Sequence, residues 1–313
     1  MGFSGKHASS TAWIAGLTVA FLWASAFPAI RVAAPALGPV GLTLSRLLIA
    51  SLTLIIIGLA SGKLHRPRRA DLPLILACGI CGMAGYFLLL NWGELYVPAG
   101  TASMIVSASP IISVTVAALL LGERLSAAAI IGSSVAIIGV AVVCLARAGI
   151  ALSSAVWIIV AAAVLLGVYH PLTRPLLKRY SGLEVATYAT TASTLMTLPM
   201  LPFAWPQLTA APGAAWLAAL YLGMLPSAAG YALWGFSLSR LTVAVTTSFL
   251  YLVPLIAVVI GYVWLDELPL GIELAGGAVV LMGVIILNFG RFPPRRARQA
   301  RAMQDAARIG GKS

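Results

Sequence analysis

The chain has 313 residues, of which 61% are hydrophobic and only 9% are charged, and its formal net charge is +12. A soluble domain is usually about half apolar and about a quarter charged, so this chain has too little polar surface to be covered by water. The composition excludes a soluble globular protein and predicts an all-α integral membrane protein.

Ten apolar runs are long enough to cross a bilayer, which requires about 20 mainly apolar residues per helix. In chain order, the predicted spans are residues 12–33, 39–60, 72–93, 98–121, 126–146, 154–173, 183–203, 213–236, 242–265 and 269–290. Breaks between the spans carry Gly, Pro or charged residues, as in "SGKLHRPRRAD" at 61–71. The flanking segments are a short N-terminus, 1–11, and a basic tail, 291–313.

Lys and Arg residues are distributed unequally over the loops. If the N-terminus faces the cytoplasm, 17 of the 20 Lys and Arg residues fall on the cytoplasmic side, and only Arg31 and Arg147 lie on the other. Cytoplasmic loops carry such an excess, so the sequence predicts a multi-pass protein of the inner (cytoplasmic) membrane with both termini in the cytoplasm. The positive face then meets anionic lipid, and no nucleic-acid partner is needed to explain the charge.

Two parts of the chain repeat one pattern. A proline, a glutamate and two glycines recur at an offset of 144 residues: Pro110 and Pro254, Glu123 and Glu267, Gly132 and Gly276, Gly139 and Gly283. The predicted domains are therefore two homologous five-helix repeats, 12–146 and 147–290. Because five is odd, the second repeat enters the membrane from the opposite side. Inverted repeats that share a central cavity are a transporter architecture.

Prolines inside the spans are candidate hinges: Pro28, Pro110, Pro171 and Pro254. Pro110 and Pro254 lack an N–H, so the carbonyls four residues earlier, at Val106 and Leu250, lose their helical partner. Such a carbonyl would be costly against lipid and is tolerated beside protein or water. The sequence therefore predicts that these kinks line the cavity and let half-helices tilt; the alternative is a static kink for packing.

The sequence resembles the drug/metabolite transporter superfamily, specifically its EamA-type members. The resemblance rests on "FLWASAFPAIR" at 21–31, "SRLLIASLTL" at 45–54 and the two proline–glutamate–glycine patterns, and it covers residues 12–290. It implies ten helices in an inverted five-plus-five repeat, a cavity formed by helices 1, 3, 4, 6, 8 and 9, and export of amino acids or related metabolites. One departure is "VLLGVYHPLTR" at 164–174, which has no counterpart of Trp23, so the two halves of the cavity are expected to differ chemically.

Span residues with hydrogen-bonding capacity should face protein or water rather than lipid. The candidate substrate-binding residues are Trp23, Tyr86, Asn91, Ser103, Ser107, Tyr169, His170, Tyr231, Trp234, Ser248 and Tyr251. An aromatic and hydroxyl lining without carboxylates suits a neutral or zwitterionic, partly apolar solute. Each aromatic residue also has a structural alternative at a membrane interface or in the core, and His170 has the alternative of a core histidine.

For three charged residues, the sequence allows both a structural and a functional role. Arg46 lies inside the second span, where it either snorkels outward or forms a structural ion pair, or else binds a substrate carboxylate. Glu123 and Glu267 lie at opposite membrane surfaces in this topology, where they either connect helices or take part in proton coupling.

The predicted function is a secondary transporter that exports small organic solutes by alternating access, above all amino acids with aromatic or large apolar side chains. An alternative of the same class is a nucleotide-sugar or phosphorylated-metabolite exchanger, and one of a different class is a channel or receptor. An enzyme is not expected, because the spans carry no HExxH and no paired Asp. The expected partners are the solute and membrane lipid, with no cofactor and no metal, and the chain is expected to be a monomer.

Overall fold

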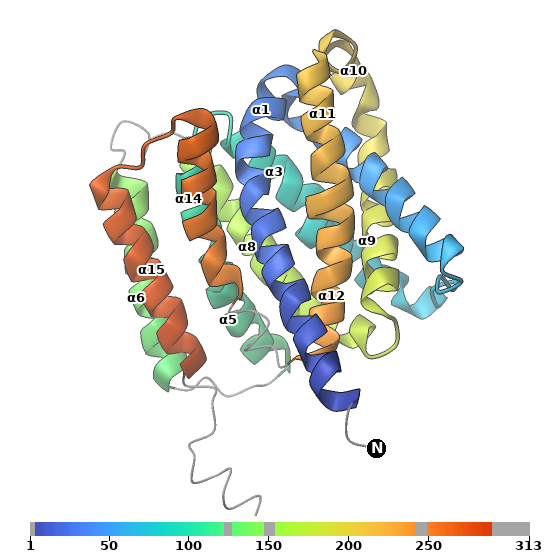
Figure 1. The fold of residues 1–313 in the computed structure, drawn as a ribbon, viewed down its shortest axis with the longest axis horizontal. Helices are drawn as coiled ribbons and strands as arrows, with labels where there is room; N and C mark the ends of the chain where they lie inside the picture. The colour runs from blue at the N-terminus through green and yellow to red at the C-terminus, as the bar shows by residue number, and fades with distance from the viewer. Residues whose placement is uncertain (1–3, 122–126, 147–153, 242–248, 290–313) are drawn as a thin grey trace, which may run out of the picture.

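A computed structural model describes residues 4–121, 127–146, 154–241 and 249–289 of the chain (Figure 1). Regular secondary structure in these residues is helical throughout. Four helical stretches are long and apolar enough to cross a membrane by length and composition: Ser10–Ala60, Arg69–Gly93, Ala155–Leu177 and Gly213–Arg240. The described part is thus an all-α assembly with several membrane-type helices, as the composition predicts.

The first helix, α1, runs over Ser4–Ala60 and is bent into two arms at Gly38, whose φ of 68° and ψ of 162° are not helical. A side chain strongly disfavours this conformation, whereas glycine adopts it readily. A Cβ at this position would also lie 2.9 Å from the side-chain oxygen of Gln207. Residues 12–33 and 39–60, predicted as two spans, are therefore the two arms of one bent element.

The elements that follow α1 up to residue 146 are shorter. They are η1 (Arg69–Asp71), α2 (Leu72–Gly79), η2 (Ile80–Ala84), α3 (Gly85–Gly93), α4 (Ala99–Val106), α5 (Ser109–Leu121) and α6 (Ala127–Ala146). Helix α2 continues through the π-helical turn η2 into α3. The predicted span 98–121 is divided into α4 and α5 between residues 106 and 109. Glu123 lies outside the described residues.

The later elements include a second π-helical segment. They are α8 (Ser154–Leu177), α9 (Gly182–Thr197), η3 (Leu198–Met200), α10 (Leu201–Ala210), α11 (Gly213–Leu222), η4 (Gly223–Ala229), α12 (Gly230–Arg240), η5 (Phe249–Tyr251), α14 (Leu252–Leu265) and α15 (Gly271–Phe289). The π-helical η4 joins α11 to α12. Helix α9 continues through η3 into α10, so this helical stretch extends beyond the predicted end at residue 203.

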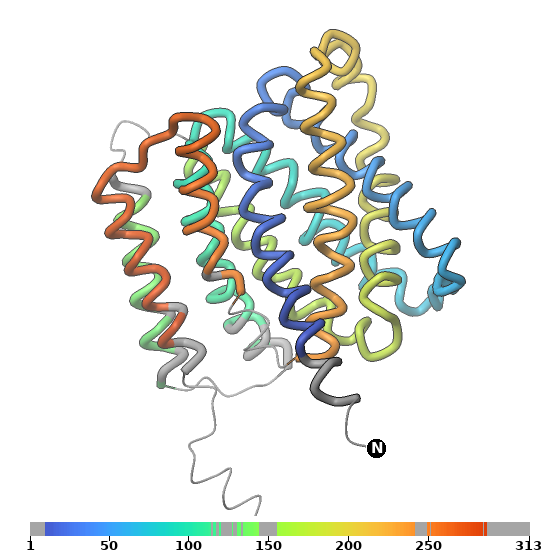
Figure 2. Tube along the Cα trace, viewed as in Figure 1, coloured from blue at the N-terminus to red at the C-terminus, as the bar shows by residue number. Residues whose placement is uncertain are grey.

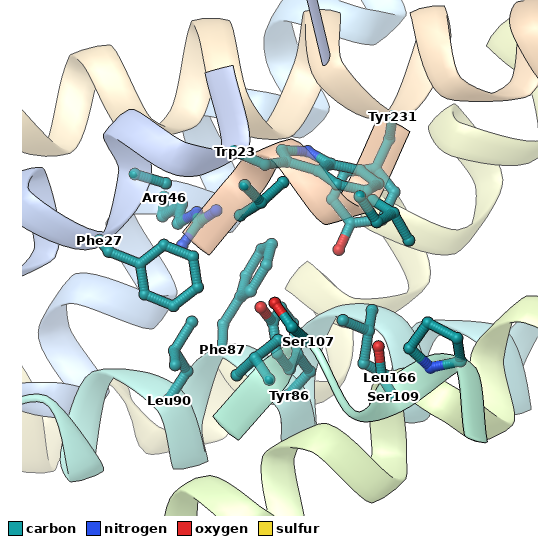
Figure 3. Close-up of a pocket in the computed structure, with 15 residues that line it drawn as sticks. Trp23, Phe27, Arg46, Tyr86, Phe87, Leu90, Ser107, Ser109, Leu166 and Tyr231 are labelled. Atoms are coloured by element: carbon teal, nitrogen blue, oxygen red, sulfur yellow. The ribbon is translucent and has the colours of Figure 1, made fainter. Parts of the chain in front are cut away.

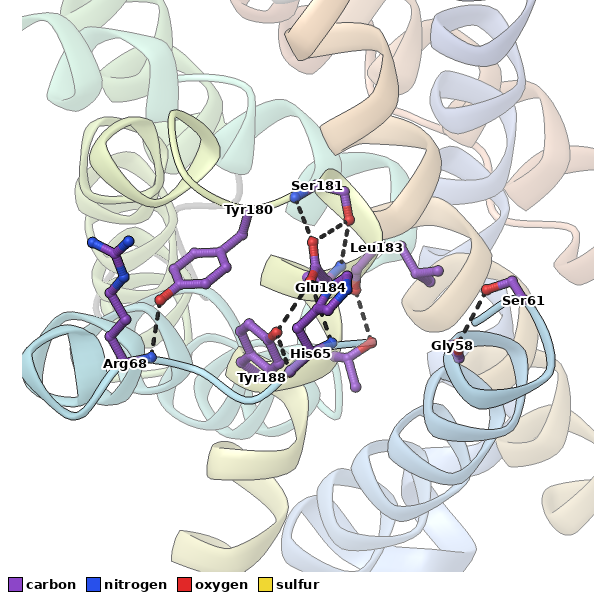
Figure 4. Close-up of polar contacts among 10 residues, drawn as sticks. Gly58, Ser61, His65, Arg68, Tyr180, Ser181, Leu183, Glu184 and Tyr188 are labelled. Atoms are coloured by element: carbon purple, nitrogen blue, oxygen red, sulfur yellow. Dashed lines mark hydrogen bonds and ion pairs between the residues drawn. The ribbon is translucent and has the colours of Figure 1, made fainter. Parts of the chain in front are cut away.

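Polar contacts join segments that are distant in the chain, and Figure 4 shows those around Glu184. Asp71 is paired with Arg179 and accepts a hydrogen bond from the Tyr180 hydroxyl at 2.7 Å. Glu184 forms a capping box with Ser181 at the start of α9, and its Oε1 lies 2.8 Å from Nδ1 of His65. These contacts hold the basic loops near residues 61–71 and 174–182 together, and the sequence assigns both loops to one side of the membrane.

Helices α6 and α15 lie side by side at the edge of the molecule (Figures 1 and 2). A Cβ added to Gly139 would lie 2.5 Å from the backbone N of Val280, and one added to Gly283 would lie 2.6 Å from the carbonyl oxygen of Gly132. Small residues allow membrane helices to approach this closely. The two pairs of glycines in the repeat pattern, Gly132 and Gly276 and Gly139 and Gly283, therefore all lie in the contact between α6 and α15.

Large apolar side chains cover much of the outer surface of the helices. Leu119, Phe203 and Val263 are each more than three quarters exposed, at 79%, 80% and 77%. Contiguous apolar surface on a protein marks a partner or a membrane. Lipid is the environment that this surface fits.

Candidate substrate site

A cavity lies among helices from both parts of the chain (Figure 3). Its walls come from α1, α3, the connection between α4 and α5, α8, α12 and the region where η5 meets α14. These segments correspond to helices 1, 3, 4, 6, 8 and 9 of the resemblance. The second arm of α1 adds a wall that the resemblance does not include, and it contributes Arg46.

Aromatic rings from distant segments meet at the cavity. The ring of Trp23 lies 5.3 Å from that of Tyr231 and 5.1 Å from that of Trp234, measured between centroids. Tyr231 also contacts Phe87 at 6.2 Å and Tyr169 at 5.8 Å, both edge to face. Such pairs are favourable beyond the apolar area they bury. The cluster therefore joins α1 and α3 to α8 and α12 around one apolar space.

Two side chains of this cluster also hold the π-helical segments. The Trp23 Nε1–H donates to the carbonyl of Pro226 in η4 at 3.0 Å, and the Tyr231 hydroxyl donates to the carbonyl of Gly82 in η2 at 2.7 Å. A π-helical turn interrupts the regular α-helical ladder, and such turns are frequent at functional sites. Each hydrogen bond satisfies a backbone carbonyl that lies beside the cavity wall.

The break between α4 and α5 opens onto the cavity. Helix α4 ends at Val106, α5 begins at Ser109, and Pro110 is the second residue of α5. Val106, Ser107, Ser109 and Pro110 all line the cavity. Pro110 has no N–H to offer the Val106 carbonyl, so backbone as well as hydroxyl oxygens are available at this wall.

The second residue whose carbonyl was expected to lose its helical partner, Leu250, also lies at the cavity. Leu250 lies in η5 and lines the cavity, and Pro254 follows in the first turn of α14. Pro254 itself lines a neighbouring apolar groove with Met104 and Leu274. Pro28 is buried within α1 and Pro171 within α8.

The predicted substrate-binding residues fall into four groups, of which the last consists of Asn91 and Ser103. Those that line the cavity are Trp23, Tyr86, Ser107 and Tyr231. Those that lie directly behind this lining, in ring contact with it or with each other, are Tyr169, His170 and Trp234. Ser248 and the side chain of Tyr251 lie outside the described residues.

Asn91 and Ser103 have local partners and do not line the cavity. The Asn91 side chain donates from Nδ2 to the Thr43 hydroxyl at 3.0 Å, which ties α3 to the second arm of α1. The Ser103 hydroxyl donates to the carbonyl of Gly100 at 2.6 Å, one turn earlier in its own helix. Both are fully buried.

Several lining residues were not among the candidate substrate-binding residues: Phe27, Arg46, Phe87, Ser109 and Leu166. Of these, Arg46 was considered only as an alternative, a ligand for a substrate carboxylate. Two of them carry a signal in the sequence. Ser109 directly precedes Pro110, and Arg46 is a charged residue inside an apolar run. The other three are apolar residues in apolar helices, where no local pattern separates a cavity-facing position from a lipid-facing one.

Comparison with known proteins supports a transporter. A probable terminal-alkyne amino-acid exporter of Streptantibioticus cattleyicolor is 50% identical over 282 residues, covering 90% of this chain and 94% of that protein. The uncharacterized transporter YdfC of Bacillus subtilis is 32% identical over 264 residues, covering 84% and 86%. A probable amino-acid metabolite efflux pump of Salmonella typhimurium is 26% identical over 299 residues, covering 90% and 96%.

One solved crystal structure has the same fold. It superposes with a TM-score of 0.61 at 23% identity and covers 89% of this chain and 97% of that one. The sequence matches the EamA-like transporter family twice, over residues 10–145 and 153–289. The sequence-based expectation of a transporter rather than an enzyme is confirmed. The chain therefore belongs to the EamA-like transporter family of the drug/metabolite transporter superfamily and is a multi-pass membrane protein that moves small molecules.

Proposed function

We propose that this transporter exports amino acids with large apolar or aromatic side chains across the cytoplasmic membrane by alternating access. The observation that carries the proposal is the aromatic cavity, where Trp23 and Tyr86 meet Tyr231 from a distant part of the chain. Ring faces can stack on an apolar side chain, and each aromatic pair contributes about 0.5–1.5 kcal/mol beyond area burial. Relatives named as a probable amino-acid exporter and a probable amino-acid metabolite efflux pump support the substrate class and the direction.

The proposed architecture is ten spans in two inverted five-helix repeats, 12–146 and 147–290, with both termini in the cytoplasm. Two family matches of similar length support the repeat. The π-helical segments η2 and η4 lie 143 residues apart at their first residues, close to the offset of the sequence repeat. Discontinuous helices at a shared cavity are typical of transporters built from inverted repeats.

The proposed mechanism requires one end of the cavity to open while the other closes. At the end opposite the basic loops, Arg31 Nε donates to Glu267 Oε1 at 2.9 Å and Arg31 Nη1 donates to the carbonyl of Glu94 at 2.6 Å. Glu267 Oε2 also accepts from the backbone N–H of Ala99 at 2.9 Å. These contacts tie α1 to the loops before α4 and α15, and release of solute at this end must break them.

The cavity favours an amino acid over the runner-up substrates. Nucleotide sugars and phosphorylated metabolites carry several negative charges, which proteins usually bind with clusters of Arg and Lys. Among the described residues that line the cavity, Arg46 is the only one with a charged side chain. A channel or receptor remains an alternative of a different class, and kinetics separates it from a carrier.

Flux through the purified protein in liposomes tests the proposal. Labelled phenylalanine, propargylglycine (an amino acid with a terminal alkyne), aspartate and a nucleotide sugar are supplied at equal concentration. We expect phenylalanine and propargylglycine to cross faster than the other two, because only their side chains match an apolar, aromatic wall.

Two further measurements show which results would contradict the proposed substrate and the proposed mechanism. Faster flux of the nucleotide sugar would replace the proposed substrate with the runner-up. Unlabelled phenylalanine on the opposite side should accelerate uptake of label by counterflow, which a carrier shows and a channel does not. A flux that rises linearly with concentration and shows no counterflow would contradict alternating access.

A further inference from the structure

Arg46 is an unusual side chain in this cavity, because it is a cation that is only 3% exposed among apolar and aromatic neighbours. It projects from the second arm of α1, and its guanidinium carbon lies 3.7 Å from the centre of the Phe87 ring. Figure 3 shows the guanidinium on the side of the cavity where Phe27 and Phe87 lie. A cation over a ring face is stabilised by the ring quadrupole, which holds the guanidinium in place without neutralising it.

The hydrogen-bonding capacity of Arg46 is only partly used. Its Nε donates to the hydroxyl of Ser227 at 2.6 Å. Its Nη1 is buried and has no hydrogen-bond partner among the described residues. Because Ser227 belongs to the π-helical η4, the second half of the chain orients the guanidinium and leaves a donor free.

No carboxylate of the described chain takes up this donor. The titratable groups that interact electrostatically with Arg46 are Tyr231, Tyr86 and Glu94. The two tyrosines are neutral hydroxyls in the cavity wall, and neither carboxylate oxygen of Glu94 accepts a hydrogen bond. A buried cation whose only hydrogen-bond acceptor here is a neutral hydroxyl, with no carboxylate paired to it among the described residues, is costly, so this site favours a ligand that brings its own negative charge.

We propose that Arg46 binds the carboxylate of the transported solute and makes the cavity selective for apolar monocarboxylates, amino acids included. This inference rests on the proposed function and deepens it. An arginine donates charge-assisted hydrogen bonds to a carboxylate, and such bonds are stronger than neutral ones. The unpartnered Nη1 can donate to one oxygen of a single carboxylate, while the rings of Phe27 and Phe87 contact the apolar part of the solute.

The ammonium group of an amino acid requires acceptors instead of donors. The wall at the α4–α5 break supplies them, through the hydroxyls of Ser107 and Ser109 and the backbone carbonyl of Val106. These oxygens are neutral, whereas Arg46 is charged. Loss of the carboxylate should therefore weaken binding more than loss of the ammonium group.

Three ligands that share a phenyl ring separate the contributions of the carboxylate and the ammonium group to binding. They are phenylalanine, phenylalaninamide and 3-phenylpropanoate. Phenylalaninamide lacks the carboxylate, and 3-phenylpropanoate lacks the ammonium group. Binding to the purified protein is measured by isothermal titration calorimetry. We expect the wild-type protein to bind phenylalanine about tenfold to a hundredfold more tightly than phenylalaninamide, as loss of a charge-assisted hydrogen bond implies. We expect 3-phenylpropanoate to lie closer to phenylalanine than the amide does.

The variants Arg46→Gln and Arg46→Lys test whether Arg46 causes this preference. Arg46→Gln should lower the ratio between phenylalanine and phenylalaninamide toward one, and Arg46→Lys should restore part of it because the charge returns. Arg240→Gln is the matched control, since Arg240 also lies over a phenylalanine ring, at 4.2 Å from Phe236, but is exposed and does not line the cavity.

Retention of the wild-type ratio in Arg46→Gln would overturn the inference, as would equal binding of phenylalanine and its amide by the wild-type protein. The wild-type comparison holds even if a variant fails to fold. A different result would contradict the proposed function without contradicting this inference. If the protein binds 3-phenylpropanoate through Arg46 but moves no amino acid, carboxylate recognition stands and amino-acid export does not.

Discussion

Two glutamates at one end of the molecule differ in whether their carboxylates accept hydrogen bonds. Glu267 accepts hydrogen bonds from Arg31 and from the backbone of Ala99. Glu94, in the connection after α3, is fully buried, and neither of its carboxylate oxygens accepts a hydrogen bond in the described structure. Burial raises the pKa of Glu94 well above its usual range, and the nearby charge of Arg31 opposes this rise without cancelling it.

Glu94→Gln should therefore change how stability depends on pH. A carboxyl group with a raised pKa binds its proton more tightly in the folded state, so the free energy of unfolding falls as pH rises from the unfolded pKa, about 4.3, toward the folded one. The wild-type protein should lose stability between pH 5 and about pH 8, and Glu94→Gln should lose less. Thermal unfolding in detergent at both pH values measures this.

Glu267→Gln is the comparison for that experiment. It removes the charged acceptor of Arg31, so it should lower the unfolding temperature at both pH values. Equal pH dependence of the wild-type protein and Glu94→Gln would show that the buried carboxyl group has no raised pKa.

Trp23 combines a cavity-lining ring with a hydrogen bond to the Pro226 carbonyl. Trp23→Phe keeps ring surface but removes that bond, and it should cost about 1–3 kcal/mol of stability, since a buried carbonyl loses its donor. Trp23→Ala should in addition reduce the preference for phenylalanine over aspartate in liposome flux. Trp234→Ala removes a ring behind the lining, so it should change this preference less. Equal effects of the two alanine variants on preference would contradict this distinction.

At the level of elements, the division of α4 from α5 depends on Pro110. Pro110→Ala restores an N–H that can bond to the Val106 carbonyl, so the two helices should join more regularly and Ser107 should leave its present position. We expect slower phenylalanine flux with unchanged or higher thermal stability. Pro206→Ala, at an exposed proline inside α10 that does not line the cavity, is the control, and parental flux in Pro110→Ala would make this break a packing feature.

The bend of α1 at Gly38 is a second feature at the level of elements. Gly38→Ala forces a side chain into a conformation reserved for glycine and toward Gln207, so it should cost about 1–3 kcal/mol of stability. Gly213→Ala is the control, because a Cβ there meets nothing within 4 Å. The unfolding temperatures of the two variants should differ clearly, and similar values would mean that the bend tolerates a side chain.

At the scale of the whole molecule, the proposed topology predicts that the basic loops lie in the cytoplasm. In a background without native cysteines, the exposed positions Lys63 and Lys178 should react as Lys63→Cys and Lys178→Cys only when a membrane-impermeant thiol reagent reaches the cytoplasmic face. Leu268→Cys, in the loop before α15 at the other end, should react in intact cells. Labelling of Lys178→Cys from outside would overturn the proposed orientation.

The features predictable from the sequence were those that depend on position along the chain. Apolar runs of sufficient length predict membrane helices because a bilayer tolerates no unsatisfied backbone. The offset of 144 residues shared by Pro110 and Pro254 and by the glutamate and glycine pairs predicts a repeat, and the chain matches the family model over two successive stretches, 10–145 and 153–289. Trp23, Tyr86 and Tyr231 were predicted as candidates because polar atoms avoid lipid, and all three line the cavity.

The direction in which each side chain points was decided only by the tertiary structure. In water, an apolar stripe identifies the buried face of a helix, but lipid and protein interior are both apolar, so that contrast is absent. The sequence alone therefore left Arg46 either snorkelling outward or in a structural ion pair, or else facing a substrate, and it could not show that Asn91 bonds to Thr43 instead of lining the cavity. Helix packing determines where both side chains lie, because it brings Ser227 to Arg46 and Thr43 to Asn91 from segments distant in the chain.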